Sequence, residues 1–386
     1  MRKLFYENIN LTDFNATVVS CEPAADSKRY RVLLDATAFF PEEGGQSADK
    51  GTLNDLPVLD VQIKDDLIYH YVSVPLEPGT TINGHVDWAQ RFDFMQQHSG
   101  EHIVSGLVHG RFGYNNVGFH LSTNEVTLAF DGDLSPEQLR EIERCANEII
   151  YQNLPVEITY PSKEELSTLS YRSKIEIEGQ VRIVTIPGVD VCACCAPHVD
   201  KTGAIGMIKI TNCQSHRGGV RLNILCGARA LADYNNKQDS VTAISVALSA
   251  KQDLIAEAVL KVKDDILRQQ ERINDLQAKY LELSISTLPA PEEAEHAVLF
   301  VDKMDTIAIR NTVNTLAERY NGYCGVFSGD EENGYQFIVG SKNKDCKELA
   351  QTFRTEFGAK CGGNTPMIQG SITAPKERIA ACLNQV

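Results

Sequence analysis

The sequence predicts an α+β fold, and three observations support this prediction. Short runs of strand-forming residues fill positions 1–88, helical periodicity begins at Trp88, and a heptad repeat runs from Ile255 to Leu283. At 386 residues the chain is also too long for one ordinary domain. We expect four segments: a β-rich, barrel-like domain at 1–88, an α/β domain at 89–235, a long helix or coiled coil at 236–290, and a small α/β domain at 291–386.

The first segment has the composition of short strands. Arg29–Leu34 and Leu67–Val74 mix β-branched and aromatic residues. Turn-forming residues separate such runs, as at Gly44-Gly45 and at Asp49-Lys50-Gly51. A β-rich domain follows from this alternation of strand and turn chemistry.

At the start of the second segment, the spacing of apolar residues changes from a strand pattern to a helical one. Between Trp88 and Leu107, the apolar residues Phe94, Ile103 and Val104 are compatible with one helical face. A second helix is expected from Ser135 to Tyr151, because Ser135-Pro136-Glu137 combines an N-cap, a first-turn proline and an early acid. Strands are expected at Val156–Tyr160, Val181–Ile186 and Ile205–Thr211.

Apolar residues then recur in alternating steps of three and four between Ile255 and Leu283, broken by Gln269, and the run ends at Pro289. This seam predicts a long amphipathic helix, either packed on its own protein or paired in a coiled coil. In the last segment, strands are expected at Ala297–Val301, Gly325–Phe327 and Gln336–Val339, with a helix at Lys347–Phe357.

Composition narrows the class of protein. No run approaches the ~18 apolar residues of a membrane helix, and Glu7 and Asp13 interrupt any signal peptide early, so a cytoplasmic protein without a membrane partner is expected. In a reducing compartment, the 11 cysteines are expected to be buried thiols or metal ligands. A net charge of -15 argues weakly against a nucleic-acid partner, although a local basic patch would suffice.

The first candidate site is His98-Ser99-Gly100-Glu101-His102, inside the first predicted helix. Residues four apart share one helical face, so both imidazoles can reach one ion. The order differs from the zinc-protease motif, in which glutamate follows the first histidine directly; here Ser99 has that place. Glu101 is a candidate general base, with a solvated or supporting role as the alternative.

The second candidate site is Cys192-Ala193-Cys194-Cys195-Ala196-Pro197-His198, a loop that contains a CxxxH pair. Cys194 and His198, together with the two helical histidines, would complete a tetrahedral N/S set for zinc. Spacing alone also allows Cys192 or Cys195 as the ligand. The alternatives to a metal site are a cluster of reduced thiols and a redox pair of Cys192 with Cys195.

These motifs resemble a known family. HxxxH followed about ninety residues later by CxxxH-Val is similar to the editing domain of alanyl-tRNA synthetase and its free-standing AlaX relatives. Thr37-Ala38-Phe39-Phe40-Pro41-Glu42-Glu43-Gly44-Gly45-Gln46 through Gly51 resembles the family's "FYPEGGGQ…D.G" segment. Thr202–Gly206 and Gly219-Val220-Arg221 resemble the stretch that follows CxxxH.

The resemblance extends to the C-terminal segment. Lys360-Cys361-Gly362-Gly363-Asn364 resembles the glycine-rich signature of the synthetase's C-terminal domain, as in the long form of AlaX. Two departures stand out. The family's Cys-Gly-Gly-Thr-His is Cys194-Cys195-Ala196-Pro197-His198 here, and Cys361 replaces a glycine. Neither departure removes a proposed ligand.

The resemblance implies an aminoacyl-tRNA deacylase, an ester hydrolase that removes serine, or glycine, from mischarged alanine tRNA. It implies Zn²⁺ held by His98, His102, Cys194 and His198. It assigns catalytic or substrate contacts to Thr37, Gln46 and Glu101, and contacts with the substrate or tRNA to Gly44, Gly45, Arg221, Gly362 and Gly363. Gly44-Gly45-Gln46 could otherwise be an ordinary turn. The implied partners are alanine tRNA, at its acceptor end and body, and a second copy of the chain.

The mechanism stays open at this stage. Four protein ligands would close the zinc tetrahedron, so either one ligand is displaced or zinc positions the substrate for a bound water. A non-catalytic tRNA-binding protein with a structural zinc is the competing hypothesis. The sequence has no GxxxxGK[ST] phosphate loop, so ATP-dependent charging of tRNA is not expected.

Overall fold

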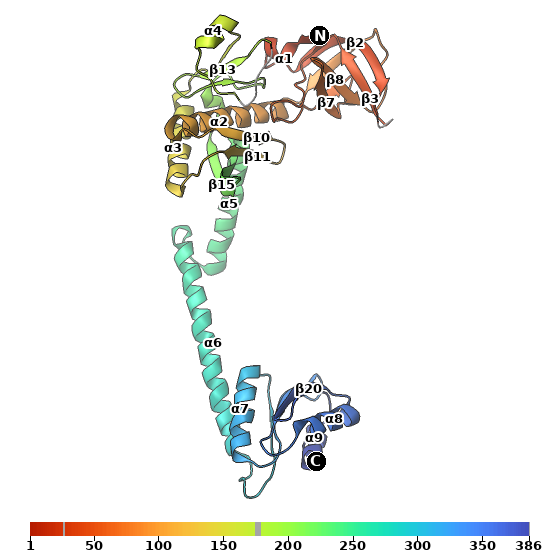
Figure 1. Ribbon diagram of the computed structural model, residues 1–386, viewed down its shortest axis with the longest axis vertical. Helices are drawn as coiled ribbons and strands as arrows, with labels where there is room; N and C mark the ends of the chain where they lie inside the picture. Colours follow the sequence, from red (N-terminus) through yellow and green to blue (C-terminus); the bar gives the residue numbers. More distant parts are fainter. Residues whose placement is uncertain (26–27, 174–178, 386) are drawn as a thin grey trace. The chain divides into compact units, whose positions relative to one another are not determined.

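A computed structural model describes residues 1–25, 28–173 and 179–385. The chain forms two compact units, Met1–Thr242 and Ala243–Val386, and Figure 1 labels their helices and strands. The fold is mixed α and β, as expected. Among the described residues, no helix is long and apolar enough to cross a membrane.

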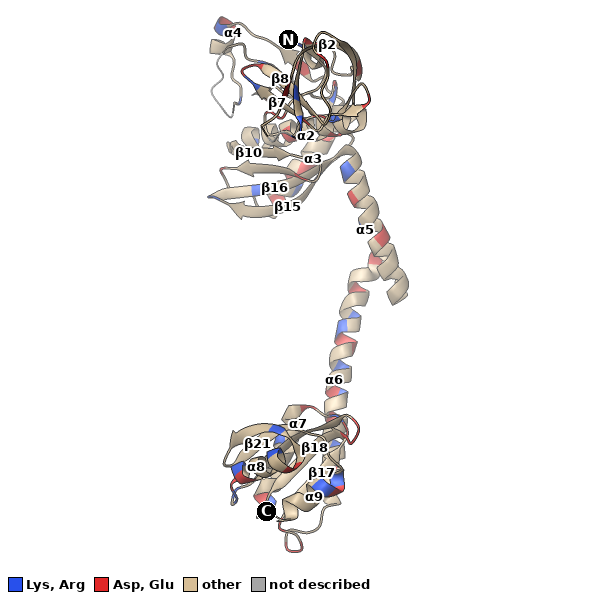
Figure 2. Cartoon of the chain, turned by 90° about the vertical axis from the view of Figure 1, so that its right-hand side faces the viewer, with Lys and Arg blue, Asp and Glu red and all other residues tan. Residues whose placement is uncertain are grey.

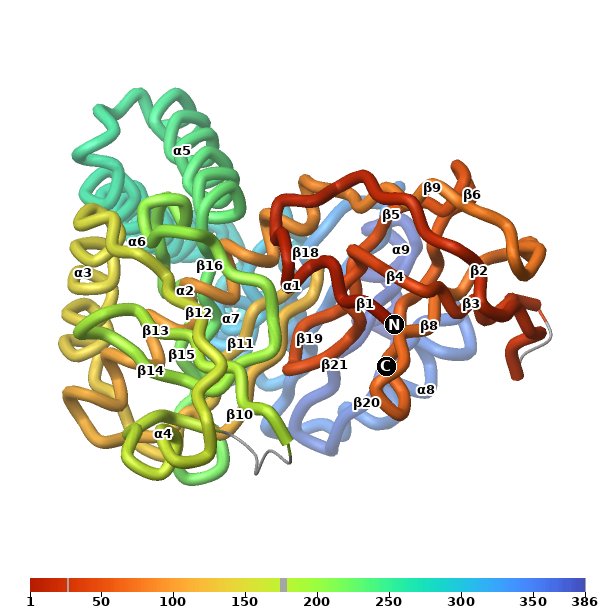
Figure 3. The backbone as a smooth tube through the Cα atoms, turned by 90° about the horizontal axis from the view of Figure 1, so that it is seen from above, coloured from red at the N-terminus to blue at the C-terminus, as the bar shows by residue number. Residues whose placement is uncertain are grey.

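The first unit begins with a curled sheet of seven strands in the order β6-β5-β9-β2-β3-β8-β7, gathered in red and orange in Figure 3. The paired neighbours are all antiparallel. Its elements are β2 (Asp13–Pro23), β3 (Tyr30–Leu34), β5 (Gly51–Leu53), β6 (Leu56–Pro57), β7 (Asp60–Lys64), β8 (Leu67–Val72) and β9 (Thr81–Val86). A short helix α1 (Leu4–Glu7) follows β1 (Arg2–Lys3), which pairs in parallel with β4 (Ala36–Thr37).

Alternation of side chains explains this sheet. In β9 the residues Ile82, Gly84 and Val86 are buried while those between them are exposed. The inward residues pack into one apolar core with Val32 and Ile68. The strands therefore form a half-barrel whose end strands, β6 and β7, do not pair with each other, while the division into a separate domain at 1–88 stays a prediction.

The second part of the first unit surrounds the long helix α2 (Trp88–Phe112). The remaining elements are α3 (Pro136–Gln152), α4 (Lys163–Thr168), a 3₁₀ turn at Thr202–Ile205, the four-stranded sheet β10 (Asn116–Leu121), β11 (Val126–Phe130), β16 (Gly219–Cys226) and β15 (Ile208–His216), and the three-stranded sheet β12 (Glu157–Thr159), β13 (Ile183–Ile186) and β14 (Asp190–Ala193).

The ends of α2 and α3 follow from local chemistry. The Asp87 side chain accepts the backbone N–H of Gln90, and α2 ends where Gly113 adopts a φ of 73°. Ser135 forms the expected N-cap of α3, in a capping box with Gln138. The middle of α2, however, is buried on every side and not on one apolar face, so its polar residues lie in the interior.

The second unit has a five-stranded sheet in the order β17-β18-β19-β21-β20. Its elements are β17 (Ala297–Val301), α7 (Thr306–Arg319), β18 (Cys324–Asp330), β19 (Gly334–Gly340), α8 (Cys346–Phe357), β20 (Lys360–Asn364), β21 (Met367–Ile372) and α9 (Lys376–Gln385). One core joins α7 to the sheet through Val313 and Leu316, and another joins α8 and α9 through Phe353 and Leu383.

The segment expected as one long helix is two helices in the structure. α5 (Gly227–Leu248) starts earlier than expected, and α6 (Ile255–Ser286) carries the heptad seam. Ser249 between them adopts a φ of 50°, and the Ser245 hydroxyl donates to the carbonyl of Ala250, which ends α5. Figure 2 shows Lys and Arg interspersed with Asp and Glu along α6.

Candidate metal centre

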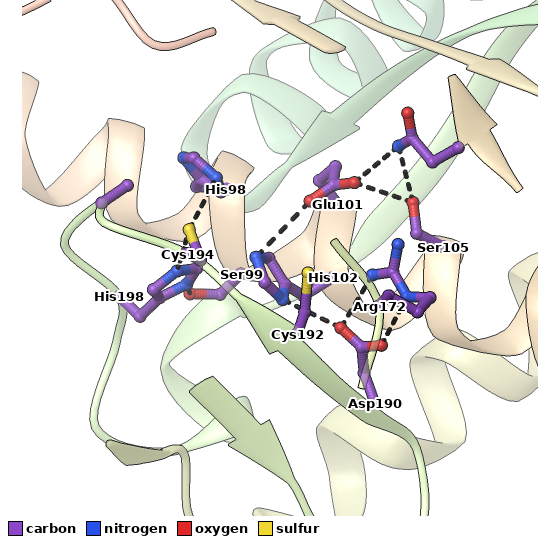
Figure 4. A network of polar contacts seen from close by, with 12 residues as sticks. His98, Ser99, Glu101, His102, Ser105, Arg172, Asp190, Cys192, Cys194 and His198 are labelled. Carbon is purple, nitrogen blue, oxygen red and sulfur yellow. Dashed lines mark hydrogen bonds and ion pairs between the residues drawn. The ribbon is translucent and has the colours of Figure 1, made fainter. Parts of the chain in front are cut away.

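Three histidines and one cysteine converge at the middle of α2. His98 and His102 project from this helix, and Cys194 and His198 lie on the loop that follows β14 (Figure 4). One ligand atom from each of the four residues lies within 4.8 Å of the others. The Cys194 Sγ atom is 3.5 Å from His98 Nε2 and 3.4 Å from His198 Nε2. A single cation could therefore contact all four side chains.

The other ring nitrogen of each histidine meets an oxygen acceptor. The acceptors are Gln46 Oε1 at 2.9 Å from His98 Nδ1, Asp190 Oδ2 at 2.9 Å from His102 Nδ1, and Ser99 Oγ at 3.1 Å from His198 Nδ1. When Nδ1 donates to these oxygens, Nε2 keeps its lone pair for a metal ion. Partners of this kind fix the tautomer and the orientation of metal-binding imidazoles.

The electrostatics prepare Cys194 and His198 as ligands. Burial opposes ionisation of Cys194, but His98 and His198 beside it hold the pKa of its thiol well below the ordinary value. Burial lowers the pKa of His198 to about 3, which keeps its ring neutral. At His102 burial favours the neutral ring, but the hydrogen bonds to Asp190 and Cys194 raise the pKa of the imidazole well above its ordinary value, so a metal ion would displace a proton from that ring. A thiolate with neutral imidazoles is the ligand form that Zn²⁺ and similar thiophilic cations favour, so the residues fit such a metal.

The geometry distinguishes among the three cysteines of the loop. Cys192 is grouped with His102 and Asp190 and not with the other three ligands, and burial raises the pKa of its thiol to about 11. Burial also raises the pKa of Cys195, with the Cys194 charge as the next cause. Both thiols are therefore held protonated, and Cys194 is the thiolate at the centre.

Asp190 links the centre to Arg172, and sequence reasoning missed both residues. Arg172 donates from Nε to Asp190 Oδ1 at 2.7 Å and from Nη2 to Oδ2 at 2.8 Å, and His102 shares Oδ2 (Figure 4). Although burial acts in the opposite direction, these hydrogen bonds lower the pKa of Asp190. In the sequence, the only indication of this role was that Asp190 lies just before the ligand loop.

We expect Asp190→Asn to lower metal affinity 10- to 100-fold, roughly, because it weakens the acceptor for His102 and leaves Arg172 without its charge partner. Competition with a chromophoric chelator measures this affinity. Asp200→Asn, a change at an exposed aspartate ten residues along, is the matched control. Equal affinities for the two variants would contradict the supporting role of Asp190.

Glu101 is buried beside the centre, which excludes a solvated role for it. Its Oε1 atom accepts the Ser105 hydroxyl at 2.8 Å and Asn116 Nδ2 at 2.6 Å. Its Oε2 atom lies 3.7 Å from His102 Nε2, the nitrogen that faces the other ligands. The carboxylate is therefore held in place near the position of a metal ion.

The glycine turn reaches the centre from the half-barrel. Glu43 and Gln46 close the turn through their backbones, and Leu121 of β10 pairs with it on the far side. Gly45 has a φ of 83°, and a Cβ there would lie 2.6 Å from the carbonyl oxygen of Phe119, so a larger residue would displace the turn. Gln46 Nε2 is buried and has no partner among the described residues.

Thr37 is fully buried in β4, where its hydroxyl lies 2.8 Å from His70 Nε2 and accepts the backbone N–H of Phe39 at 3.1 Å. His70 Nδ1 lies 3.4 Å from the carbonyl oxygen of Val32. The Thr37 hydroxyl is thus engaged within the half-barrel, and its contact with a substrate stays a prediction.

His70 makes the stability of the first unit depend on pH. Burial lowers the pKa of His70 to about 4, below the ordinary value of 6.5, so between these pH values the unfolded chain binds more protons. Stability is therefore lost as pH falls from about 6.5 through 4, by roughly 3 kcal/mol for this group. Urea unfolding from pH 7 to 4 should show a shallower pH dependence for His70→Leu than for wild type. Parallel pH profiles would contradict this.

The other predicted contact residues are not among the four ligands or the partners described for them. Arg221 is exposed on β16, and its Nη2 is 3.0 Å from His216 Nε2. Gly362 and Gly363 lie on β20 in the second unit. Within the described part of the first unit, no hydrogen bond or ion pair joins Arg221 to the metal centre, and the tRNA contacts of all three residues stay predictions.

Comparison with known families gives the class of the protein. Residues 181–222, which include Cys194 and His198, match the model described as threonyl and alanyl tRNA synthetase second additional domain. Residues 4–90, which include the glycine turn, match the model described as tRNA synthetases class II (A). Fold and site therefore define a synthetase-type domain with a His/Cys cluster that could bind a metal ion.

Whole-chain relatives narrow this class to one family. The alanyl-tRNA editing protein Aarsd1 of Danio rerio is 30% identical over 95% of this chain and 93% of its own length. The Bos taurus protein of the same name is 31% identical over 72% of this chain and 67% of its own. An alanine–tRNA ligase of Methanococcus maripaludis is 27% identical over 99% of this chain but only 43% of the ligase. The chain belongs to the alanyl-tRNA editing protein family.

Proposed function

We propose that this protein is a zinc-dependent deacylase that hydrolyses the ester of mischarged alanine tRNA, with the seryl ester as the preferred substrate and the glycyl ester as a second one. The observation that carries the proposal is the convergence of His98, His102, Cys194 and His198 in a family named for alanyl-tRNA editing. A zinc ion bound there would polarise the ester carbonyl or lower the pKa of a water molecule.

Two side chains of the centre have the chemistry to assist. Gln46 Nε2 belongs to the amide that holds His98, so this unpaired N–H donor can bind an ester oxygen on which negative charge develops. Glu101 Oε2 lies 3.7 Å from His102 Nε2 and can accept a proton from the attacking water. Cognate alanine would be spared because a site built to hydrogen-bond the serine hydroxyl loses that bond with alanine.

The tRNA and a second copy of the chain are the proposed partners, and the cytoplasm is the proposed location. Arg221 on β16, with Gly44 and Gly45 near the centre, would contact the acceptor end, and Gly362 and Gly363 the tRNA body. For the homodimer, the seam of α6 offers the surface: Val262, Ile266 and Leu276 are 42%, 60% and 50% exposed.

The experiment that tests the proposal measures release of serine, glycine and alanine from alanine tRNA charged with each. We expect fast loss of serine, intermediate loss of glycine and slow loss of alanine. If all three esters survive while the protein still binds the tRNA, the deacylase proposal fails and a tRNA-binding protein with a structural metal replaces it.

A further inference from the structure

The glycine turn begins with a half-buried carboxylate, that of Glu43. Among the residues that the structure describes, no ion pair or hydrogen bond engages this side chain; only its backbone bonds to Gln46. The neighbouring carboxylate of Glu42 differs, since it accepts Gln62 Nε2 at 2.8 Å. Glu43 also replaces a glycine of the family's "FYPEGGGQ" segment, so the carboxylate is a feature of this chain.

Two contacts place the turn that carries this carboxylate at the edge of the metal centre. A Cβ at Gly44, the next residue, would lie 3.1 Å from Cys195 Sγ, and Cys195 adjoins the ligand Cys194. Gln46, at the other end of the turn, holds His98.

The other carboxylates around the centre already have partners. Asp190 binds Arg172 and His102, and Glu101 accepts Ser105 and Asn116. Gln46, in the same turn as Glu43, is 1% exposed. Its Nε2 donor has no hydrogen-bond partner among the described residues. An unpaired anion and an unpaired buried donor on one four-residue turn point to a ligand that supplies both a cation and an acceptor.

An aminoacyl ester supplies both, as its α-ammonium group and its carbonyl oxygen. A divalent ion with one thiolate and three neutral imidazoles has a net positive charge, which repels an ammonium group a few ångströms away. A carboxylate at the edge of the centre offsets this repulsion and orients the substrate. We propose that Glu43 binds the α-ammonium group of the aminoacyl ester, a specificity contact that rests on the proposed deacylase function.

The test compares two esters of alanine tRNA: seryl-tRNA, and its deaminated counterpart in which a hydroxyl replaces the α-ammonium group. The variants are Glu43→Gln and the matched control Glu42→Gln. For Glu43→Gln we expect kcat/KM for the seryl ester to fall about 10- to 100-fold, the effect of one charged hydrogen bond, and kcat/KM for the deaminated ester to stay unchanged. Glu42→Gln should change neither. Metal content and thermal unfolding confirm that each variant is intact.

Equal losses on both esters, or no loss on either, would overturn the Glu43 contact while leaving the deacylase function in place. A wild-type protein that hydrolyses neither ester would instead overturn the proposed function and this inference with it. The two failures are therefore distinguishable in one set of measurements.

Discussion

Cys194→Ala is expected to lose the bound metal and to reduce hydrolysis of seryl alanine tRNA by about 10³-fold or more, as loss of a central catalytic feature does. Cys194 is the only thiolate of the four-residue cluster, and its Sγ atom lies within 3.5 Å of two histidine Nε2 atoms. Without it, three imidazoles remain, and the soft ligand that favours zinc is gone. Metal content by mass spectrometry and single-turnover hydrolysis measure the two effects.

Cys213→Ala is the matched control, because Cys213 is also a half-buried cysteine but lies on β15. It should keep the metal and the activity of the wild type. Cys194→Ala protein that retains both would show that the thiolate is not a ligand.

Asp49→Ala is expected to destabilise the first unit by roughly 3–5 kcal/mol, because it leaves the buried Arg91 cation without its carboxylate partner. Arg91, on α2, and Asp49 are 1% and 2% exposed and form an ion pair. Asp49 also accepts the backbone N–H of Phe40 at 2.6 Å, and Arg91 Nη2 donates to the carbonyl of Ala38 at 2.7 Å. The ion pair thus links the half-barrel to α2, the helix that carries His98.

Urea unfolding monitored by circular dichroism tests this expectation. The control is Glu7→Ala, which removes an exposed ion pair with Arg2 and should leave the unfolding midpoint in place. A midpoint for Asp49→Ala equal to that of the control would contradict a fastening role for the buried pair.

The parts of the structure that were predictable are those set by local chemistry. The N-cap at Ser135 and the four-residue spacing of His98 and His102 needed only neighbouring residues. The break after Leu248 was missed because no proline or glycine marks it; Ser249 takes the left-handed conformation there.

The features that the sequence did not predict depend on contacts between residues far apart in the chain. The CxxxH spacing favoured Cys194 but did not exclude Cys192 or Cys195. The pairing of β13 with β14 and the contact of the following loop with α2 bring Cys194 to the histidines. In the same way, Asp190 gains its role from a strand that lies 88 residues from His102 in sequence. Thr37 and Gln46 lie in the same family-like segment, yet the Thr37 hydroxyl contacts His70, a partner that the sequence does not indicate.

We propose above all that a metal ion at the four-residue cluster supports ester hydrolysis. The most direct measurement is single-turnover release of serine from seryl alanine tRNA by protein stripped with a chelator, then reloaded with measured amounts of zinc. We predict that stripped protein is inactive and that the rate rises in proportion to zinc until one ion per chain is bound, whereas His102→Ala does not recover. Stripped protein that hydrolyses the ester as fast as reloaded protein would contradict the account.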